Sequence, residues 1–238
     1  MRRGSGDLGL GARARIHRII RLLESEYGIP HGRRSRDLLG SLIATILSQN
    51  TTSANAQQAF STLQMRFPVW EDVATARLAT IAASIRPAGL APQRAPRIKK
   101  LVQRLVSEHG RASLAFLRKM DSRAAVSYLT SFSGVGRKTA SCLLLFDMGR
   151  DAFPVDTHVA RLARRLELVD RSASVDEIQD RLEELCPREK FLSLHLNLVR
   201  HGRLVCKARR PRCGSCVLER LCPAFRARLE GQAALNGE

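Results

Sequence analysis

Apolar residues recur along most of the chain with the period of an α-helix, and no stretch alternates convincingly as a strand would. Residues 38–47 are apolar almost all round, which predicts a central, buried helix. The other helical stretches are residues 16–27, 53–66, 70–85 (one or two short helices), 97–109, 122–129, 137–148, 157–167, 175–185 and 191–203. The sequence therefore predicts an all-α protein of about ten helices, long enough at 238 residues to bury a good core.

Polar segments separate these helices. Residues 31–37 are polar and basic and suit a crossing between domains, and residues 86–92 predict a loop. The first fifteen residues are rich in Arg and Gly without an apolar core, so we expect a disordered basic arm and no export signal, with a short transit peptide as the alternative. No apolar run approaches the roughly 20 residues of a membrane span. We expect a cytoplasmic, nucleoid-associated protein of prokaryotic type.

The chain is strongly basic. It has 40 Lys and Arg against 22 Asp and Glu, a net charge of +18 spread along the whole length. This excess indicates a polyanionic partner, with nucleic acid ahead of an anionic membrane surface.

A glycine hairpin lies between the helices predicted over residues 122–129 and 137–148. Gly134 and Gly136 flank Val135, and a helix starts directly afterwards, so backbone N–H groups and the helix dipole favour an anion there. Arg137 and Lys138 add positive charge. The hairpin suits one phosphate of a DNA strand, although an ordinary helix–turn–helix corner explains the glycines equally well.

Two residues near the hairpin could carry chemistry. Lys138 lies at a helix N-terminus beside Arg137, and both features favour the neutral amine that a Schiff-base nucleophile needs. Asp156 precedes the next helix and could stabilise a cationic transition state and accept protons. The alternatives are a solvated phosphate-binding lysine and an aspartate that only caps its helix.

Four of the six cysteines crowd into one segment with the spacing C-x6-C-x2-C-x5-C. Such crowding predicts a closed metal site, while the spacing matches neither a zinc ribbon nor a common ferredoxin pattern. The four candidate ligands are Cys206, Cys213, Cys216 and Cys222. Basic residues in the same loop suit a DNA backbone, and the remaining cysteines, Cys142 and Cys186, are expected to fill apolar core.

The hairpin and the segment after it carry a family resemblance. LTSFSGVGRKTA followed by FPVDTHVARL resembles the helix-hairpin-helix glycosylases of the endonuclease III type, over about residues 16–223. Phe132-Ser133 stands where the family often has Leu-Pro. The resemblance implies two lobes with the active cleft between them. A six-helix lobe would span residues 31–150, with the helix-hairpin-helix at about 122–148, and residues 1–30 with 151–238 would form the other lobe.

The resemblance also assigns roles to residues. It implies Lys138 as the Schiff-base lysine, Asp156 as the essential aspartate, and a [4Fe-4S] cluster on the four cysteines in the loop of residues 206–222. Asn50 takes the position of the residue that fills the gap left by a flipped base, with Gln49 before it, and Leu90 matches the second wedge. The hairpin through Thr139 would bind DNA.

The implied function is a bifunctional DNA glycosylase and AP lyase of base excision repair, because family members with this lysine also cleave the strand. The expected partner is double-stranded DNA with a damaged base, an oxidised pyrimidine in particular, or an abasic site, and we expect a monomer. The alternatives are a glycosylase for mismatched thymine, uracil or adenine, and a non-catalytic iron–sulfur DNA-binding protein.

Overall fold

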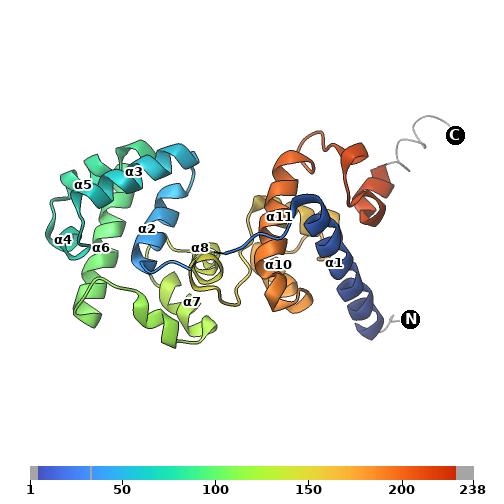
Figure 1. Cartoon of the computed structure of the whole chain (residues 1–238), viewed down its shortest axis with the longest axis horizontal. Coiled ribbons are helices and arrows are strands. Elements are labelled where there is room, and N and C mark those ends of the chain that lie inside the picture. Colours follow the sequence, from blue (N-terminus) through green and yellow to red (C-terminus); the bar gives the residue numbers. More distant parts are fainter. Residues whose placement is uncertain (1–4, 33, 229–238) are drawn as a thin grey trace. The chain divides into compact units, whose positions relative to one another are not determined.

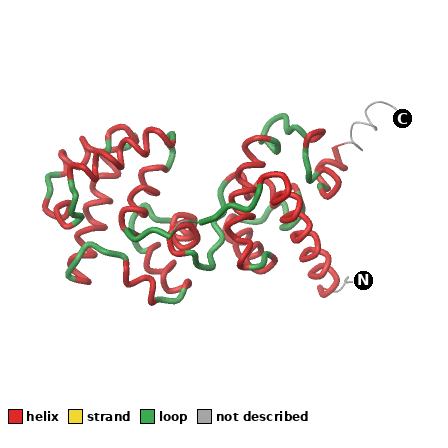
Figure 2. The backbone as a smooth tube through the Cα atoms, in the orientation of Figure 1, coloured by secondary structure: helices red, strands yellow, loops and turns green. Residues whose placement is uncertain are grey.

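The computed structural model describes residues 5–32 and 34–228, and the regular structure in that part of the chain is all helical (Figures 1 and 2). The chain divides into two compact units. The first unit consists of the described residues up to Gly32 together with those from Asp151 onward, and the second unit consists of the described residues between them. The prediction of an all-α protein is confirmed.

The second unit contains the glycine hairpin. Its elements are α2 (Leu38–Ser48), α3 (Ser53–Arg66), α4 (Glu71–Thr75), α5 (Leu78–Ser84), η1 (Arg86–Ala88), α6 (Ala91–His109), η2 (Ala115–Lys119), α7 (Ser122–Thr130), α8 (Arg137–Cys142) and η3 (Leu143–Met148). Helix α2 packs against α3, α6, α8 and η3, which makes it the centre of this unit (Figure 1). Leu39, Leu42 and Ile43 of α2 are fully buried, as its apolar sequence predicts.

Helix α6 begins earlier than predicted, at Ala91 instead of residue 97. The expected loop over residues 86–92 is a short 3-10 turn, η1, followed at once by the first turn of α6. Pro92 lies in that first turn, where a helix needs no N–H donor, so this proline starts the helix instead of breaking it. Pro96 lies inside the helix, between the buried residues Ala95 and Ile98.

The helix predicted over residues 137–148 is regular only in its first half. Helix α8 passes directly into a π-helix, η3, which ends at Gly149 with φ +64°. Because a π-helix has more residues per turn than an α-helix, the side chains of Leu143 to Met148 point in other directions relative to Lys138 than they would in a continuous α-helix.

The first unit joins the two ends of the chain. Its elements are α1 (Ser5–Tyr27), α9 (Thr157–Arg165), α10 (Val175–Leu185), η4 (Arg188–Lys190), α11 (Phe191–Leu204), η5 (Cys213–Ser215) and η6 (Glu219–Leu221). Helix α1 starts at Ser5, so the prediction of a disordered arm up to residue 15 is wrong for residues 5–15, where Leu, Ala and Arg favour a helix in spite of the glycines. The first four residues lie outside the described part of the chain.

Polar contacts hold the end of α1 against η4 and α11. Glu24 accepts hydrogen bonds from Lys190 Nζ (2.9 Å) and Ser193 Oγ (2.6 Å), and Asn197 Nδ2 donates to Gly28 O (3.0 Å). These bonds fix the N-terminal helix beside the helix that leads into the cysteine-rich loop. None of the helices in the described part has the length and apolar character needed to cross a membrane.

Candidate functional site

The hairpin forms a tight turn between α7 and α8. Gly134 has φ +86°, and a Cβ added there would lie 3.1 Å from Arg97 Cδ, so this position requires glycine. Gly136 caps α8 in an extended conformation, and a Cβ on it would meet nothing within 4 Å. The second glycine therefore leaves open space at the helix start, where another backbone could approach.

Val135 has a structural position in this turn. Its side chain is buried, and its N–H donates to Phe132 O at 3.0 Å. This N–H is therefore already bonded within the turn. The backbone N–H groups that we expect to bind a phosphate are then those around Gly136. The proposed DNA contact of Val135 stays a prediction.

Lys138 is the second residue of α8 and its side chain is exposed, whereas the next residue, Thr139, is buried. The side chain of Gln49, which directly follows α2, extends to the hairpin and to the start of α8. Its Nε2 donates to Gly134 O (3.2 Å) and to Thr139 Oγ1 (3.4 Å). The structure thus brings together the hairpin, the start of α8 and the turn after α2, as the resemblance implies for a DNA-binding surface.

The two predicted wedge residues are exposed and share an unusual backbone. Asn50 and Leu90 both have φ +53°, the left-handed region that asparagine enters with some ease and leucine rarely. Leu90 is 53% exposed. The open alternative, that Leu90 folds back on the core, is wrong for this structure.

Asp156 caps α9 in the first unit. Its Oδ1 accepts the N–H of Val159 at 2.8 Å, and the side chain is partly exposed. The structure therefore confirms that Asp156 caps its helix. This bond occupies one of its two carboxylate oxygens. Asp156 and Lys138 belong to different units of the chain.

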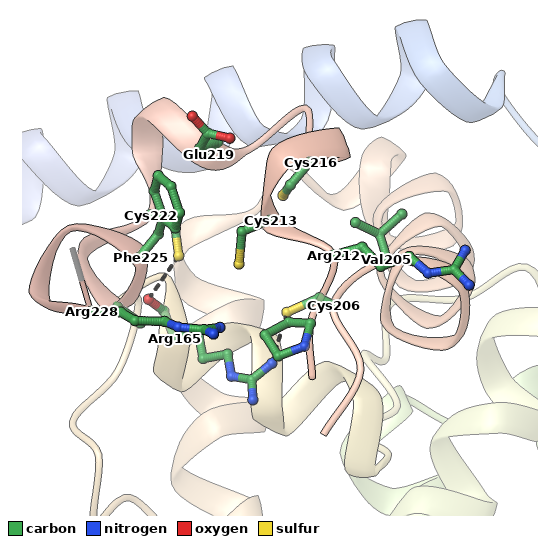
Figure 3. Close-up of a pocket in the computed structure, with 12 residues that line it drawn as sticks. Arg165, Val205, Cys206, Arg212, Cys213, Cys216, Glu219, Cys222, Phe225 and Arg228 are labelled. Carbon is green, nitrogen blue, oxygen red and sulfur yellow. Dashed lines mark hydrogen bonds between the residues drawn. The ribbon is translucent and has the colours of Figure 1, made fainter. Parts of the chain in front are cut away.

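The four predicted cysteine ligands line a single cavity of about 230 Å³ in the first unit (Figure 3). Arg165 and Phe225 line the same cavity. Within the described part of the chain, no three His, Cys, Asp or Glu side chains converge closely enough to hold one metal ion. The thiols therefore surround a space instead of meeting at a point.

Hydrogen bonds reach the cysteine sulfurs from neighbouring helices. Arg165 Nη1 donates to Cys206 Sγ at 3.2 Å, and His201 Nε2 lies 3.3 Å from Cys216 Sγ. His201 Nδ1 lies 2.8 Å from the hydroxyl of Tyr27. Burial lowers the pKa of His201 to about 4 and raises the pKa of Cys216 to about 11.

The neutral imidazole of His201 can donate from Nε2 to the sulfur while Nδ1 accepts from the tyrosine. This link between α1 and the cysteine loop was not predicted from the sequence. The only signal for it was the position of His201 shortly before the first cysteine.

The basic side chains of the cysteine loop face solvent. Lys207, Arg209, Arg210 and Arg212 are all exposed, as expected for residues that could meet a DNA backbone. Of the two remaining cysteines, Cys186 is buried and burial raises its pKa to about 12, which agrees with a role in the core.

Comparison with known proteins identifies the family. Residues 43–188, more than half of the chain, match the model of the HhH-GPD superfamily of base excision DNA repair proteins. The chain is also 33% identical over 194 residues to an endonuclease III of Sulfolobus acidocaldarius, covering 81% of this chain and 84% of that protein. The chain belongs to the endonuclease III family. The expected family and its helix-hairpin-helix fold are thereby confirmed.

Other relatives agree with this assignment. A putative DNA glycosylase of Arabidopsis thaliana is 40% identical over 167 residues, which are 70% of this chain but only 57% of that protein. Among solved structures, a trapped covalent intermediate of endonuclease III with DNA matches with a TM-score of 0.77 and 27% identity, over 91% of this chain and 98% of that one.

Proposed function

We propose that this endonuclease III family member is a bifunctional DNA glycosylase and AP lyase that removes oxidised pyrimidines through a Schiff base on Lys138. The observation that carries the proposal is the position of Lys138. It is an exposed amine on the second residue of a helix whose first residue follows an open, glycine-capped turn. The solved structure of a trapped endonuclease III–DNA covalent intermediate, on the same fold, supports a covalent mechanism.

The proposed reaction assigns one step to each of the two residues. Lys138 Nζ bonds to C1′ of the sugar as the bond from C1′ to the damaged base breaks, and Asp156 accepts the proton that the amine loses. The base leaves with the electron pair of that bond and takes a proton from water. The bond between C1′ and O4′ then breaks, Asp156 passes its proton to O4′, and the open sugar is a protonated imine between Nζ and C1′. Loss of a proton from C2′ expels the 3′ phosphate and cleaves the strand.

Asp156 can take this part without leaving its structural position. Its capping bond to Val159 uses Oδ1 only, so Oδ2 remains for the sugar. A carboxylate there would also stabilise the positive charge that develops on the sugar as the base departs. The proposal requires that the two units place this oxygen and Lys138 Nζ on the same deoxyribose.

We further propose that Asn50, and not Gln49, fills the space left by the flipped base, with Leu90 as the second wedge. The side-chain amide of Gln49 is engaged with the hairpin, at Gly134 O and Thr139 Oγ1. Asn50 is exposed at the tip of the turn. Extrusion of a base from a duplex needs such a replacement for the lost stacking.

The four cysteines are proposed to hold a [4Fe-4S] cluster. Four thiolates on one zinc ion would lie about 4 Å from one another, given Zn–S bonds of about 2.3 Å. The thiols here instead surround a cavity of about 230 Å³ and do not converge on one point, which suits a larger group bound at four corners. When bound, the cluster would brace the loop that presents Lys207, Arg209 and Arg210 to phosphates.

The test of the catalytic proposal is borohydride trapping on a panel of duplexes. The panel carries an oxidised pyrimidine, a mismatched thymine or uracil, or an adenine opposite oxidised guanine. We expect a covalent adduct and strand cleavage with the oxidised pyrimidine, both lost in Lys138→Gln and both retained in Lys100→Gln, which removes an exposed lysine of α6. An adduct with a different lesion would change the substrate, and the absence of any adduct would indicate a DNA-binding protein.

A further inference from the structure

Arg94 is a buried cation in the second unit with an uncommon set of partners. Its side chain is only 3% exposed, and no carboxylate of the described residues pairs with it. Instead Nη1 donates to Leu47 O (2.8 Å) and Ala88 O (3.1 Å), and Nη2 donates to Gln49 O. A buried guanidinium satisfied only by backbone carbonyls is expensive to desolvate, so the contacts it makes need an explanation.

The three carbonyls come from two separate segments. Leu47 and Gln49 belong to the end of α2 and the turn after it, and Ala88 belongs to the turn before α6. The last carbonyls of a helix lack intrahelical partners and carry the negative end of its dipole, so an arginine stabilises the end of α2 well. One guanidinium bonds both segments at once through two nitrogens in a fixed plane, whereas a lysine presents its three donors from one freely rotating nitrogen and does not fix their directions.

These two segments are the ones that carry the wedge residues. Asn50 follows Gln49 directly, and Leu90 lies two residues after Ala88. Both have φ +53°, and Leu90 is exposed, so no packing of its own side chain explains its conformation. Non-glycine residues persist in such a conformation only where the surroundings impose it.

We propose that Arg94 is a positioning residue that ties the turn at residues 48–50 to the turn at residues 88–90, so that Asn50 and Leu90 enter the duplex as one rigid pair. This inference rests on the proposed base-flipping function. The bond from Gln49 Nε2 to Gly134 O holds the first turn to the hairpin as well. Wedges, hairpin and the start of α8 would then form one preorganised surface.

The experiment separates base flipping from chemistry. Flipping is measured by the fluorescence of 2-aminopurine placed beside the damaged base, and chemistry by borohydride trapping on DNA with a preformed abasic site, where no base has to be extruded. Arg94→Met should lower the fluorescence increase by about tenfold, because the two wedges no longer act together. Trapping at the abasic site should remain within about threefold of wild type. Lys100→Met, which removes one exposed charge from the same helix, should change neither signal.

A second design covers the case that Arg94→Met does not fold, as shown by its thermal unfolding. In the wild-type background, Asn50→Ala and Leu90→Ala should be non-additive in flipping, because rigid wedges act as one unit. In an Arg94→Lys background, which keeps the charge but not the fork, the two effects should become additive. If folded Arg94→Met flips the base as the wild type does, or if the non-additivity is unchanged in the Arg94→Lys background, the inference about Arg94 is overturned while the proposed function stands. Absence of flipping and trapping in the wild type would overturn the proposed function instead.

Discussion

Asp156 has a structural and a proposed chemical role, and two substitutions separate them. In the structure one carboxylate oxygen caps α9 through the N–H of Val159 at 2.8 Å. Asparagine caps a helix about as well as aspartate, whereas alanine at such a position costs about 1 kcal/mol, within a range of roughly 0.5–2 kcal/mol. Asparagine cannot carry the negative charge or accept the proton that the reaction requires.

Asp156→Asn should therefore keep the free energy of unfolding within about 0.5 kcal/mol of wild type. Its base excision should fall by about 10²- to 10⁴-fold, the usual contribution of a positioned general base. Asp156→Ala should lose the same activity and in addition about 1 kcal/mol of stability. For a protein of this size that loss lowers the melting temperature by about 2–4 °C.

The assay combines thermal unfolding, followed by circular dichroism, with single-turnover excision on a duplex that carries the preferred lesion. Asp121 offers a matched control, since its Oδ1 caps α7 through the N–H of Ala124 at 2.9 Å. Asp121→Ala should show a similar loss of stability with excision unchanged. If Asp156→Asn excises bases at the wild-type rate, the carboxylate is only a cap and the chemical argument is refuted.

Three further predictions concern stability and binding. Burial raises the pKa of Asp147, which accepts a hydrogen bond from Ser41 Oγ, so the folded state holds this proton to higher pH than the unfolded state does. The contribution of Asp147 to stability should therefore be lost as the pH rises from about 4 through the folded-state pKa, and in urea titrations the difference in stability between wild type and Asp147→Asn should follow this trend. Gly202→Ala would place a Cβ 2.8 Å from His158 Cβ, so it should separate α11 from α9 and cost about 1–3 kcal/mol in chemical unfolding, whereas no change would mean that the helices shift freely. DNA affinity should decline with salt with a log–log slope of about −0.9 per phosphate neutralised, and a flat slope in fluorescence anisotropy would contradict a backbone-dominated interface.

The sequence predicted the helices best where caps and periodicity agreed. The bounds predicted for α3 and α10 match the structure, and each of the two helices has a side-chain N-cap, Thr52 and Ser174 respectively. The predictions were wrong at Pro92 and in the second half of the helix predicted over residues 137–148. Pro92 looked like part of a loop but occupies the first turn of α6, and the apolar pattern of α8 gave no sign of the π-helix that continues it.

The sequence predicted those parts of the candidate site that lie within short sequence motifs. Spacing placed the four cysteines together, and the structure gathers them around one cavity. The sequence did not predict the contacts between segments that are far apart along the chain. Nothing in the sequence marks Arg94, which lies between the expected loop and the predicted helix, as the buried partner of three carbonyls. The bond between His201 and Tyr27 has no signal besides the position of His201 shortly before the first cysteine. Such contacts depend on how helices pack, which periodicity alone does not determine.

The most direct test of the account is a crystal structure of the borohydride-trapped complex with lesion-bearing DNA. We expect a covalent bond from Lys138 Nζ to C1′ of the target sugar, with the Asp156 carboxylate within about 4–6 Å of that carbon, where a charge acts strongly on its neighbour. A bond to a different lysine, or an Asp156 carboxylate well outside that range, would contradict it.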